Sequence, residues 1–225
     1  MRYTTRITAA LLLWAASQTS FAHGIAEQER QRMLDGDFLE VLWVGAEHML
    51  TGYDHLLFLF GAVLFLAKAS RILAFITAFT IGHTITLMGA TLLGLRVNPY
   101  LIDAAIALTV IYVALENMGA FRRWGLRVPD LVIMVFAFGL VHGMGLSTRF
   151  QEMMISADPD IVTKIFAFNL GVELGQVLAL IGMLAAVNLW RGTPVYQPAA
   201  TATNFVLVAA GAALFALQIH GYLSI

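Results

Sequence analysis

The sequence contains no cysteine, and only 12% of its 225 residues are charged. The absence of cysteine excludes disulfide bonds, thiolate metal sites and cysteine nucleophiles, so histidine, carboxylate, amide or methionine must hold any metal ion. A soluble domain has about 25% charged residues, whereas 60% of this chain is hydrophobic. The composition excludes an ordinary soluble globule and indicates a protein embedded in a lipid bilayer. The net charge of −1 gives no sign of a nucleic-acid partner.

Residues 1–22 have the pattern of a secretory signal peptide. Arg2 and Arg6 precede a short apolar core, and Ser20-Phe21-Ala22 matches a small-x-small cleavage site. Cleavage after Ala22 would make His23 the first residue, with both its amine and its imidazole able to bind an entering metal ion. A retained N-terminal anchor is the alternative to cleavage, and a His23 without any role is the alternative to a ligand.

The remaining chain predicts an all-α membrane protein, a bundle of about six transmembrane helices. A polar periplasmic segment, residues 23–40, would precede one transmembrane domain, residues 41–225. Apolar runs of about 20 residues suffice to cross a bilayer, and they are found at 41–66, 72–95, 100–120, 130–147, 163–190 and 202–222. A signal peptide places the mature N-terminus outside the cytoplasm, and the basic loops after the first, third and fifth helices then face the cytoplasm. This predicts a multi-pass membrane protein.

Four ionisable residues lie close together inside the first apolar run: Glu47, His48, Asp54 and His55. Ionisable groups at membrane depth are costly, and they usually face a bundle interior or an aqueous path. In one continuous helix, residues i and i+7 return to the same face about 10 Å apart. His48 and His55 are therefore expected to share a face. Imidazole and carboxylate together suit borderline divalent ions such as Ni²⁺, Co²⁺, Zn²⁺ or Cu²⁺.

Polar residues of three other predicted helices fall at the same expected depth. His83, His142 and Glu173 are expected to converge with the histidines of the first helix in one outer pocket, and Asn169 lies one turn from Glu173. The alternative for His83 is a structural hydrogen bond to a carbonyl or threonine of another helix.

Glu116 and Asn117 fall much nearer the expected cytoplasmic end of the third helix. This separation predicts an inner station on a transport path, distinct from the outer pocket. An ion pair of Glu116 with Arg122 or Arg123 is the alternative.

Two glycine pairs predict close contacts between helices. Gly139-x3-Gly143 and Gly171-x3-Gly175 are small-xxx-small patterns, which allow helix backbones in membranes to approach closely. They flank His142 and Glu173 respectively, so the predicted pocket should lie where helices are packed most tightly.

The pattern His48-x5-Asp54-His55 resembles the HupE/UreJ family of bacterial nickel/cobalt permeases, in the form of its second subgroup. Further segments with this resemblance are Ile76–Leu87, Tyr112–Asn117, Phe138–Gly143 and Phe168–Gln176. The resemblance implies a cleaved signal peptide, about six mature helices and handling of Ni²⁺ or Co²⁺. The family's ligands in the first helix carry over to His48, Asp54 and His55. The family's other subgroup has proline after the first histidine, where this chain has Met49.

Residues and resemblance together predict a transition-metal permease of the bacterial inner membrane, a multi-pass protein with its mature N-terminus in the periplasm. The ion would bind at an intramembrane site and leave past Glu116 and Asn117, and the expected ligands are His48, Asp54, His55, His83, His142 and Glu173. One alternative is a zinc-dependent intramembrane hydrolase, which needs about three ligands, an open position and a general base. Asp54 or Glu173 could serve as that base, with Ser147 near His142, although the sequence contains no H-E-x-x-H motif. The other alternative is a membrane accessory protein that delivers metal to partners in metalloenzyme maturation. A homo-oligomer is compatible with each of these functions.

Overall fold

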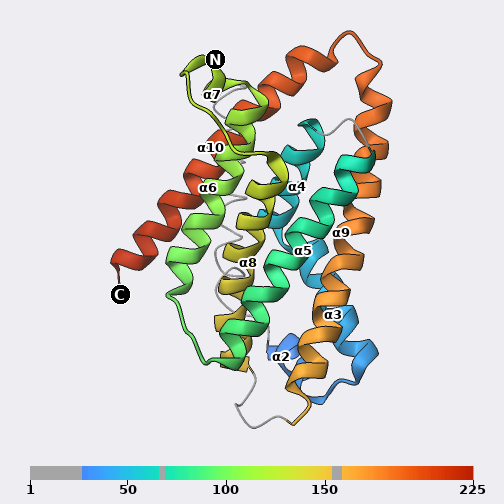
Figure 1. The fold of residues 1–225 in the computed structure, drawn as a ribbon, viewed down its shortest axis with the longest axis vertical. Coiled ribbons are helices and arrows are strands. Elements are labelled where there is room, and N and C mark those ends of the chain that lie inside the picture. The colour runs from blue at the N-terminus through green and yellow to red at the C-terminus, as the bar shows by residue number, and fades with distance from the viewer. Residues whose placement is uncertain (1–26, 66–68, 154–158, 225) are drawn as a thin grey trace, which may run out of the picture.

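Every regular element in residues 27–65, 69–153 and 159–224, which the computed structural model describes, is a helix (Figure 1). This confirms the predicted all-α class. The predicted signal peptide, residues 1–22, and His23 lie outside the described residues. The helices are α2 (Glu27–Asp35), α3 (Phe38–Thr51), α4 (Tyr53–Phe65), α5 (Ala69–Leu92), α6 (Pro99–Asn117), α7 (Ala120–Arg123), α8 (Leu131–Met153), α9 (Ile161–Arg191) and α10 (Tyr196–Leu223).

Six apolar segments correspond to the six predicted membrane helices. Within the described ranges, four are long and apolar enough to cross a bilayer, namely Ala74–Leu92, Pro99–Asn117, Ile161–Arg191 and Tyr196–Leu223. Two shorter apolar segments are Tyr53–Leu64 and Val132–Thr148. The chain is therefore a multi-pass membrane protein.

The prediction of one continuous helix over residues 41–66 is wrong. The segment consists of α3 and α4, which meet at Gly52 with the backbone extended there (φ −67°, ψ 102°). A side chain at Gly52 would crowd the next turn, since its Cβ would lie 2.7 Å from Nδ1 of His55. Asp54 lies in the first turn of α4, where the helix dipole favours a negative charge. Discontinuous helices of this kind build ion and substrate sites in many transporters.

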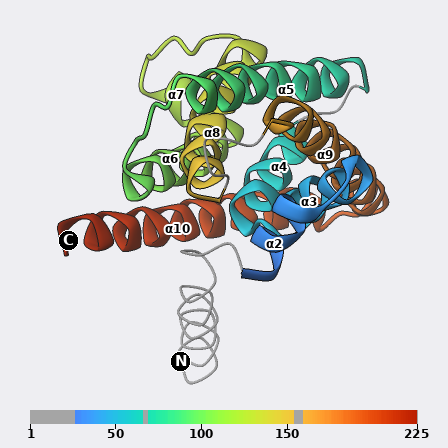
Figure 2. The same cartoon turned by 90° about the horizontal axis from the view of Figure 1, so that it is seen from below.

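The helices run alternately between two ends of the molecule, which we call the α2 end and the α7 end (Figure 1). The chain turns from α5 to α6 and from α8 to α9 at the α2 end, and from α9 to α10 at the α7 end. Figure 2, a view along the long axis, shows α10 on the opposite side of the molecule from α5, with α4, α6 and α8 between them. This arrangement places the broken pair α3 and α4 next to α9.

The closest helix pairs are α5 with α8, α3 with α9 and α6 with α10. Glycines permit the contacts of α5 with α8 and of α3 with α9, as the small-xxx-small patterns predict. A side chain at Gly139 would clash with the backbone carbonyl of Phe79, and one at Gly143 with that of His83. On the other pair, a side chain at Gly171 would clash with the carbonyl of Leu42. The tight α5–α8 contact fixes the heights of His83 and His142 relative to each other.

Four buried phenylalanines from three helices form a compact group, which we call the phenylalanine cluster: Phe58, Phe75, Phe79 and Phe138. The Phe58 ring is its centre, with ring centroids 5.7 Å from Phe75, 6.0 Å from Phe79 and 5.5 Å from Phe138. The cluster fills the interior directly beside His142, whose ring centroid is 5.9 Å from that of Phe58.

Candidate metal-binding site

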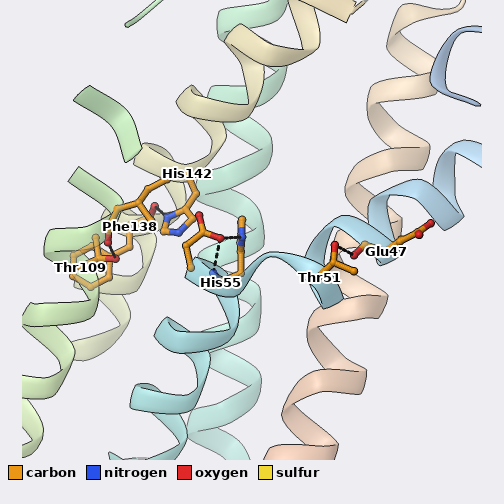
Figure 3. Close-up of polar contacts among 8 residues, drawn as sticks. Glu47, Thr51, His55, Thr109, Phe138 and His142 are labelled. Atoms are coloured by element: carbon orange, nitrogen blue, oxygen red, sulfur yellow. Dashed lines mark hydrogen bonds and ion pairs between the residues drawn. The ribbon is translucent and has the colours of Figure 1, made fainter. Parts of the chain in front are cut away.

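Three imidazole rings from three helices lie in a row: His48 of α3, His55 of α4 and His142 of α8. The ring centroids of His48 and His55 are 5.3 Å apart, and those of His55 and His142 are 5.0 Å apart. Figure 3 shows His55 and His142 beside each other near the start of α4. His142 and His55 are buried, while His48 is half-buried. The row thus runs from a partly open position into the interior. Because Gly52 interrupts the helix, the row depends on the turn between α3 and α4 and not on a shared helical face.

Two rings of the row have the Nδ1 atom against an oxygen acceptor. Nδ1 of His142 lies 2.8 Å from the backbone carbonyl of Phe138, and Nδ1 of His55 lies 3.0 Å from Oδ1 of Asp54. A carbonyl or carboxylate oxygen can only accept, so Nδ1 of each ring carries the proton. The Nε2 atom then has the free lone pair that a metal ion requires. Metal-binding histidines almost always donate their other ring N–H to such oxygens.

Asp54 holds His55 through a single oxygen atom. Its Oδ1 accepts the backbone N–H of His55 at 2.9 Å and the ring N–H at 3.0 Å. Both donors belong to the same residue, so the carboxylate fixes the ring relative to the first turn of α4. This geometry suits an orienting group for His55.

The Nε2 atom of His142 is buried and has no hydrogen-bond partner among the described residues. Buried polar atoms in folded proteins nearly always have a partner, and each exception needs an explanation. The His142 ring is 2% exposed, which excludes bulk solvent as the partner. A bound ion on the Nε2 lone pair would explain this atom.

His83 has the same arrangement but lies beside the row. Its Nδ1 is 3.0 Å from Oδ1 of Asn169, and the Thr84 hydroxyl donates to the same oxygen at 3.3 Å. The orientation of the Asn169 amide is set because its Nδ2 donates to the carbonyl of Ile165. The Phe79 ring packs against both histidines, with its centroid 6.0 Å from that of the His83 ring and 5.1 Å from that of the His142 ring. In the described residues no ring contact joins His83 directly to the row. His83 thus makes an interhelical hydrogen bond, but its partner is the side-chain amide of Asn169 on α9, and not the carbonyl or threonine of the stated alternative.

Glu173 is half-buried on α9, one turn from Asn169. No hydrogen bond or ion pair within the described ranges joins it to His55, His83 or His142. Among the same residues, no three His, Asp or Glu side chains are grouped tightly enough to hold one ion. The structure therefore shows neighbouring pairs of imidazoles, and one pocket shared by all the expected ligands stays a prediction. His55 is the common member of the two pairs, which join α3, α4 and α8.

Glu116 and Asn117 lie near the α7 end, as expected from their place in α6. The Nδ2 atom of Asn117 donates to the carbonyl of Gly61 at 2.8 Å and to Oδ1 of Asn204 at 2.9 Å. These bonds tie α4, α6 and α10 together. Glu116 lies one helical turn from Tyr112, and its buried Oε2 has no hydrogen-bond partner within the described part of the chain. The predicted alternative, an ion pair of Glu116 with Arg122 or Arg123, is absent from the described contacts.

At the α2 end, Arg32 bridges two carboxylates of α3. Its guanidinium forms ion pairs with Glu40 and with Glu47, the latter at 2.9 Å. The hydrogen bond to Glu40, followed by that to Glu47, raises the pKa of Arg32 and so favours the charged guanidinium. The bridge attaches α2 to α3 next to His48.

Sequence reasoning did not single out Asn204 and Gln176 as candidate site residues. Gln176 is fully buried on α9, and neither polar atom of its amide has a partner in the region described. Both residues are amides inside long apolar helices, and this signal could have identified them. Ser147, considered above for a hydrolase, donates its hydroxyl to the carbonyl of Met144 and not to His142.

A model of the family described as HupE / UreJ protein matches residues 25–224. Neither a curated protein nor a solved structure matches the chain.

Proposed function

The chain belongs to the HupE/UreJ family of membrane metal-ion transporters, and from this premise we propose that it is a permease for Ni²⁺ or Co²⁺ in the bacterial inner membrane. The observation that carries the proposal is the imidazole row, in which His55 and His142 each have Nδ1 bound to an oxygen. Their Nε2 lone pairs are then available to a passing cation.

Neighbouring pairs of imidazoles suit transport better than a closed cage. An ion that binds three or four fixed ligands leaves slowly, whereas conduction requires sites weak enough to release it. The ion would first bind between His48 and His55 and then between His55 and His142, with Asp54 supplying negative charge beside the pair. His83, held by Asn169, and Glu173 would lie next to this path.

In this proposal the α2 end faces the periplasm, and His23 would collect ions there. Ligands of the imidazole type bind Ni²⁺ and Co²⁺ and also Zn²⁺ or Cu²⁺, and no thiolate is present to select a softer ion. We assign Ni²⁺ or Co²⁺ because of the family. The same family argues for transport over hydrolysis.

The phenylalanine cluster lies between the row and the α7 end. Phe58 follows His55 by three residues on α4, and Gly61, whose carbonyl binds Asn117, follows by six. Six residues of helix span about 9 Å, so the ion has to pass Phe58 to reach the level of Asn117. Glu116 would be the inner station, and Asn117 would brace α4 against α6 beside it. The closed phenylalanine cluster is the barrier that has to open for release.

The test is Ni²⁺ uptake into liposomes that contain the purified protein and an internal metal-sensitive dye. We expect uptake by the unaltered protein and a loss of tenfold or more for His142→Ala, which removes the buried Nε2. His220→Ala is the matched control, since His220 is exposed near the end of α10 and should transport normally. Glu116→Gln should slow uptake while leaving Ni²⁺ binding in detergent unchanged. Normal uptake by His142→Ala would refute the proposed path.

A further inference from the structure

A cavity of about 410 Å³ lies at the α7 end, away from the imidazole row. It is open on one side and is lined by the last turn of α4, the end of α6, α7 and the first three turns of α10. The Asn117–Asn204 hydrogen bond is part of its wall. None of the histidines lines it, so it requires an explanation of its own.

The lining of the cavity is polar and positive. Arg123 is its charged residue, and its neutral polar side chains are Asn117, Tyr196, Gln197, Thr201 and Asn204. No aspartate or glutamate is among the lining residues. A cavity with a guanidinium and no carboxylate repels a metal cation and attracts an anion, and arginine in particular matches the geometry of phosphate oxygens.

Arg123 lines the cavity, and Arg191 lies behind one of its lining residues. Nη2 of Arg123 donates to the carbonyl of Met118, itself a lining residue, at 2.9 Å. Nε of Arg191 donates to the hydroxyl oxygen of Tyr196 at 3.4 Å. A tyrosine hydroxyl that accepts a hydrogen bond still has its own proton to donate. Arg191 therefore adds positive charge behind Tyr196 and leaves the hydroxyl able to bind an oxyanion.

The cavity also has an apolar side, formed by Leu64 and Phe205. Phe205 is 62% exposed on α10, a helix long and apolar enough to cross the bilayer. The cavity lies at the first turns of this helix, and the ends of a membrane-spanning helix are expected near the lipid headgroups. Polar donors next to an exposed phenylalanine match an amphiphile better than a free ion.

We propose that this cavity binds the phosphate headgroup of an anionic phospholipid. The phosphate would lie against Arg123, Tyr196 and Gln197, and an acyl chain would follow Phe205 along α10. Basic pockets between membrane helices are known to bind such headgroups. A lipid there would contact α4, α6 and α10 at the place where Asn117 joins them, and so would stabilise the folded bundle.

The experiment uses the full-length protein, purified in detergent and freed of lipid. Phosphatidylglycerol is added in mixed micelles, and the melting temperature is followed as its concentration rises. We expect phosphatidylglycerol to raise the melting temperature of the unaltered protein, and Arg123→Gln to require about tenfold more lipid for the same rise, as expected for one lost charged hydrogen bond. Arg127→Gln is the matched control, because Arg127 is exposed on the same connection but does not line the cavity.

A second variant and two other ligands test the lipid assignment further. Gln197→Leu should weaken the response to phosphatidylglycerol while keeping Arg123, and it carries the test if Arg123→Gln does not fold. If phosphatidylglycerol raised the melting temperature of Arg123→Gln or of Gln197→Leu as much as that of the unaltered protein, the assignment would be overturned. An equal rise in melting temperature with inorganic phosphate alone would show that the ligand is a soluble anion. An equal rise in melting temperature with phosphatidylcholine would show that the cavity does not recognise anionic charge. Either result contradicts the proposal.

Discussion

Replacement of Asp54 by asparagine separates two roles for this carboxylate, a metal ligand and an orienting group for His55. Oδ1 of Asp54 accepts two hydrogen bonds from His55. Asparagine keeps the size and the accepting oxygen, and both donors will direct that oxygen toward His55. Only the charge assistance is lost, and a hydrogen bond to a charged group contributes about 1 kcal/mol more than a neutral one. We therefore expect Asp54→Asn to weaken Ni²⁺ binding by about fivefold.

Alanine removes the acceptor as well as the charge. We expect Asp54→Ala to weaken binding by about a hundredfold, the upper range for loss of a group that orients a metal-binding histidine. Calorimetric titration of Ni²⁺ into the detergent-purified variants gives both affinities. Asp130→Asn is the control, because Asp130 likewise accepts a backbone N–H, that of Val132 at 2.9 Å, and lies at the start of α8 at the α7 end. Equal, complete loss in both Asp54 variants would mean that the carboxylate itself binds the ion, and unchanged binding in Asp54→Ala would refute the orienting role.

Three further predictions concern the packing around the imidazole row and its binding of Ni²⁺. Phe58→Leu should keep Ni²⁺ binding but raise the passive leakage of ions through the protein in liposomes. Phe75→Leu should not raise this leakage, because Phe75 has no ring contact to His142 in the described structure. Gly139→Val should lower the melting temperature, because the valine side chain would clash with the Phe79 carbonyl and overpacking costs about 1–3 kcal/mol. Gly182→Val is the control, since Gly182 has open space around it. Finally, Ni²⁺ affinity should fall as the solution is made more acidic, since protons compete with the ion for neutral imidazole; an affinity that stays constant on acidification would contradict imidazole ligation.

The helices and their close contacts could be predicted from the sequence because their signals are local. Apolar runs give the membrane segments, and the pair Gly139 and Gly143 identifies the tight side of α8. The neighbouring positions of His48, His55 and His142 were also expected, since the cost of burying such groups drives them into the interior.

The details of the site depend on contacts that the sequence does not contain. Glycine is tolerated in apolar helices, so Gly52 alone does not predict a break; the break accompanies the His55 ring and the Asp54 oxygen beside it. The partner of His142 is a backbone carbonyl, that of Phe138, which every residue possesses and which no pattern of side chains can indicate. The bond between Asn117 and Asn204 requires the placement of α10, which follows from packing over the whole bundle.

X-ray absorption spectroscopy of the Ni²⁺-loaded protein tests the central claim most directly, because imidazole ligands give a characteristic scattering pattern around the metal. The imidazole row predicts nitrogen and oxygen ligands with scattering from about two imidazoles, matching neighbouring pairs in the row. The imidazole signal should diminish in His55→Ala and persist in His220→Ala. A spectrum without imidazole scattering, or one dominated by methionine sulfur, would contradict the assignment of His48, His55 and His142 as the ligands of the transported ion.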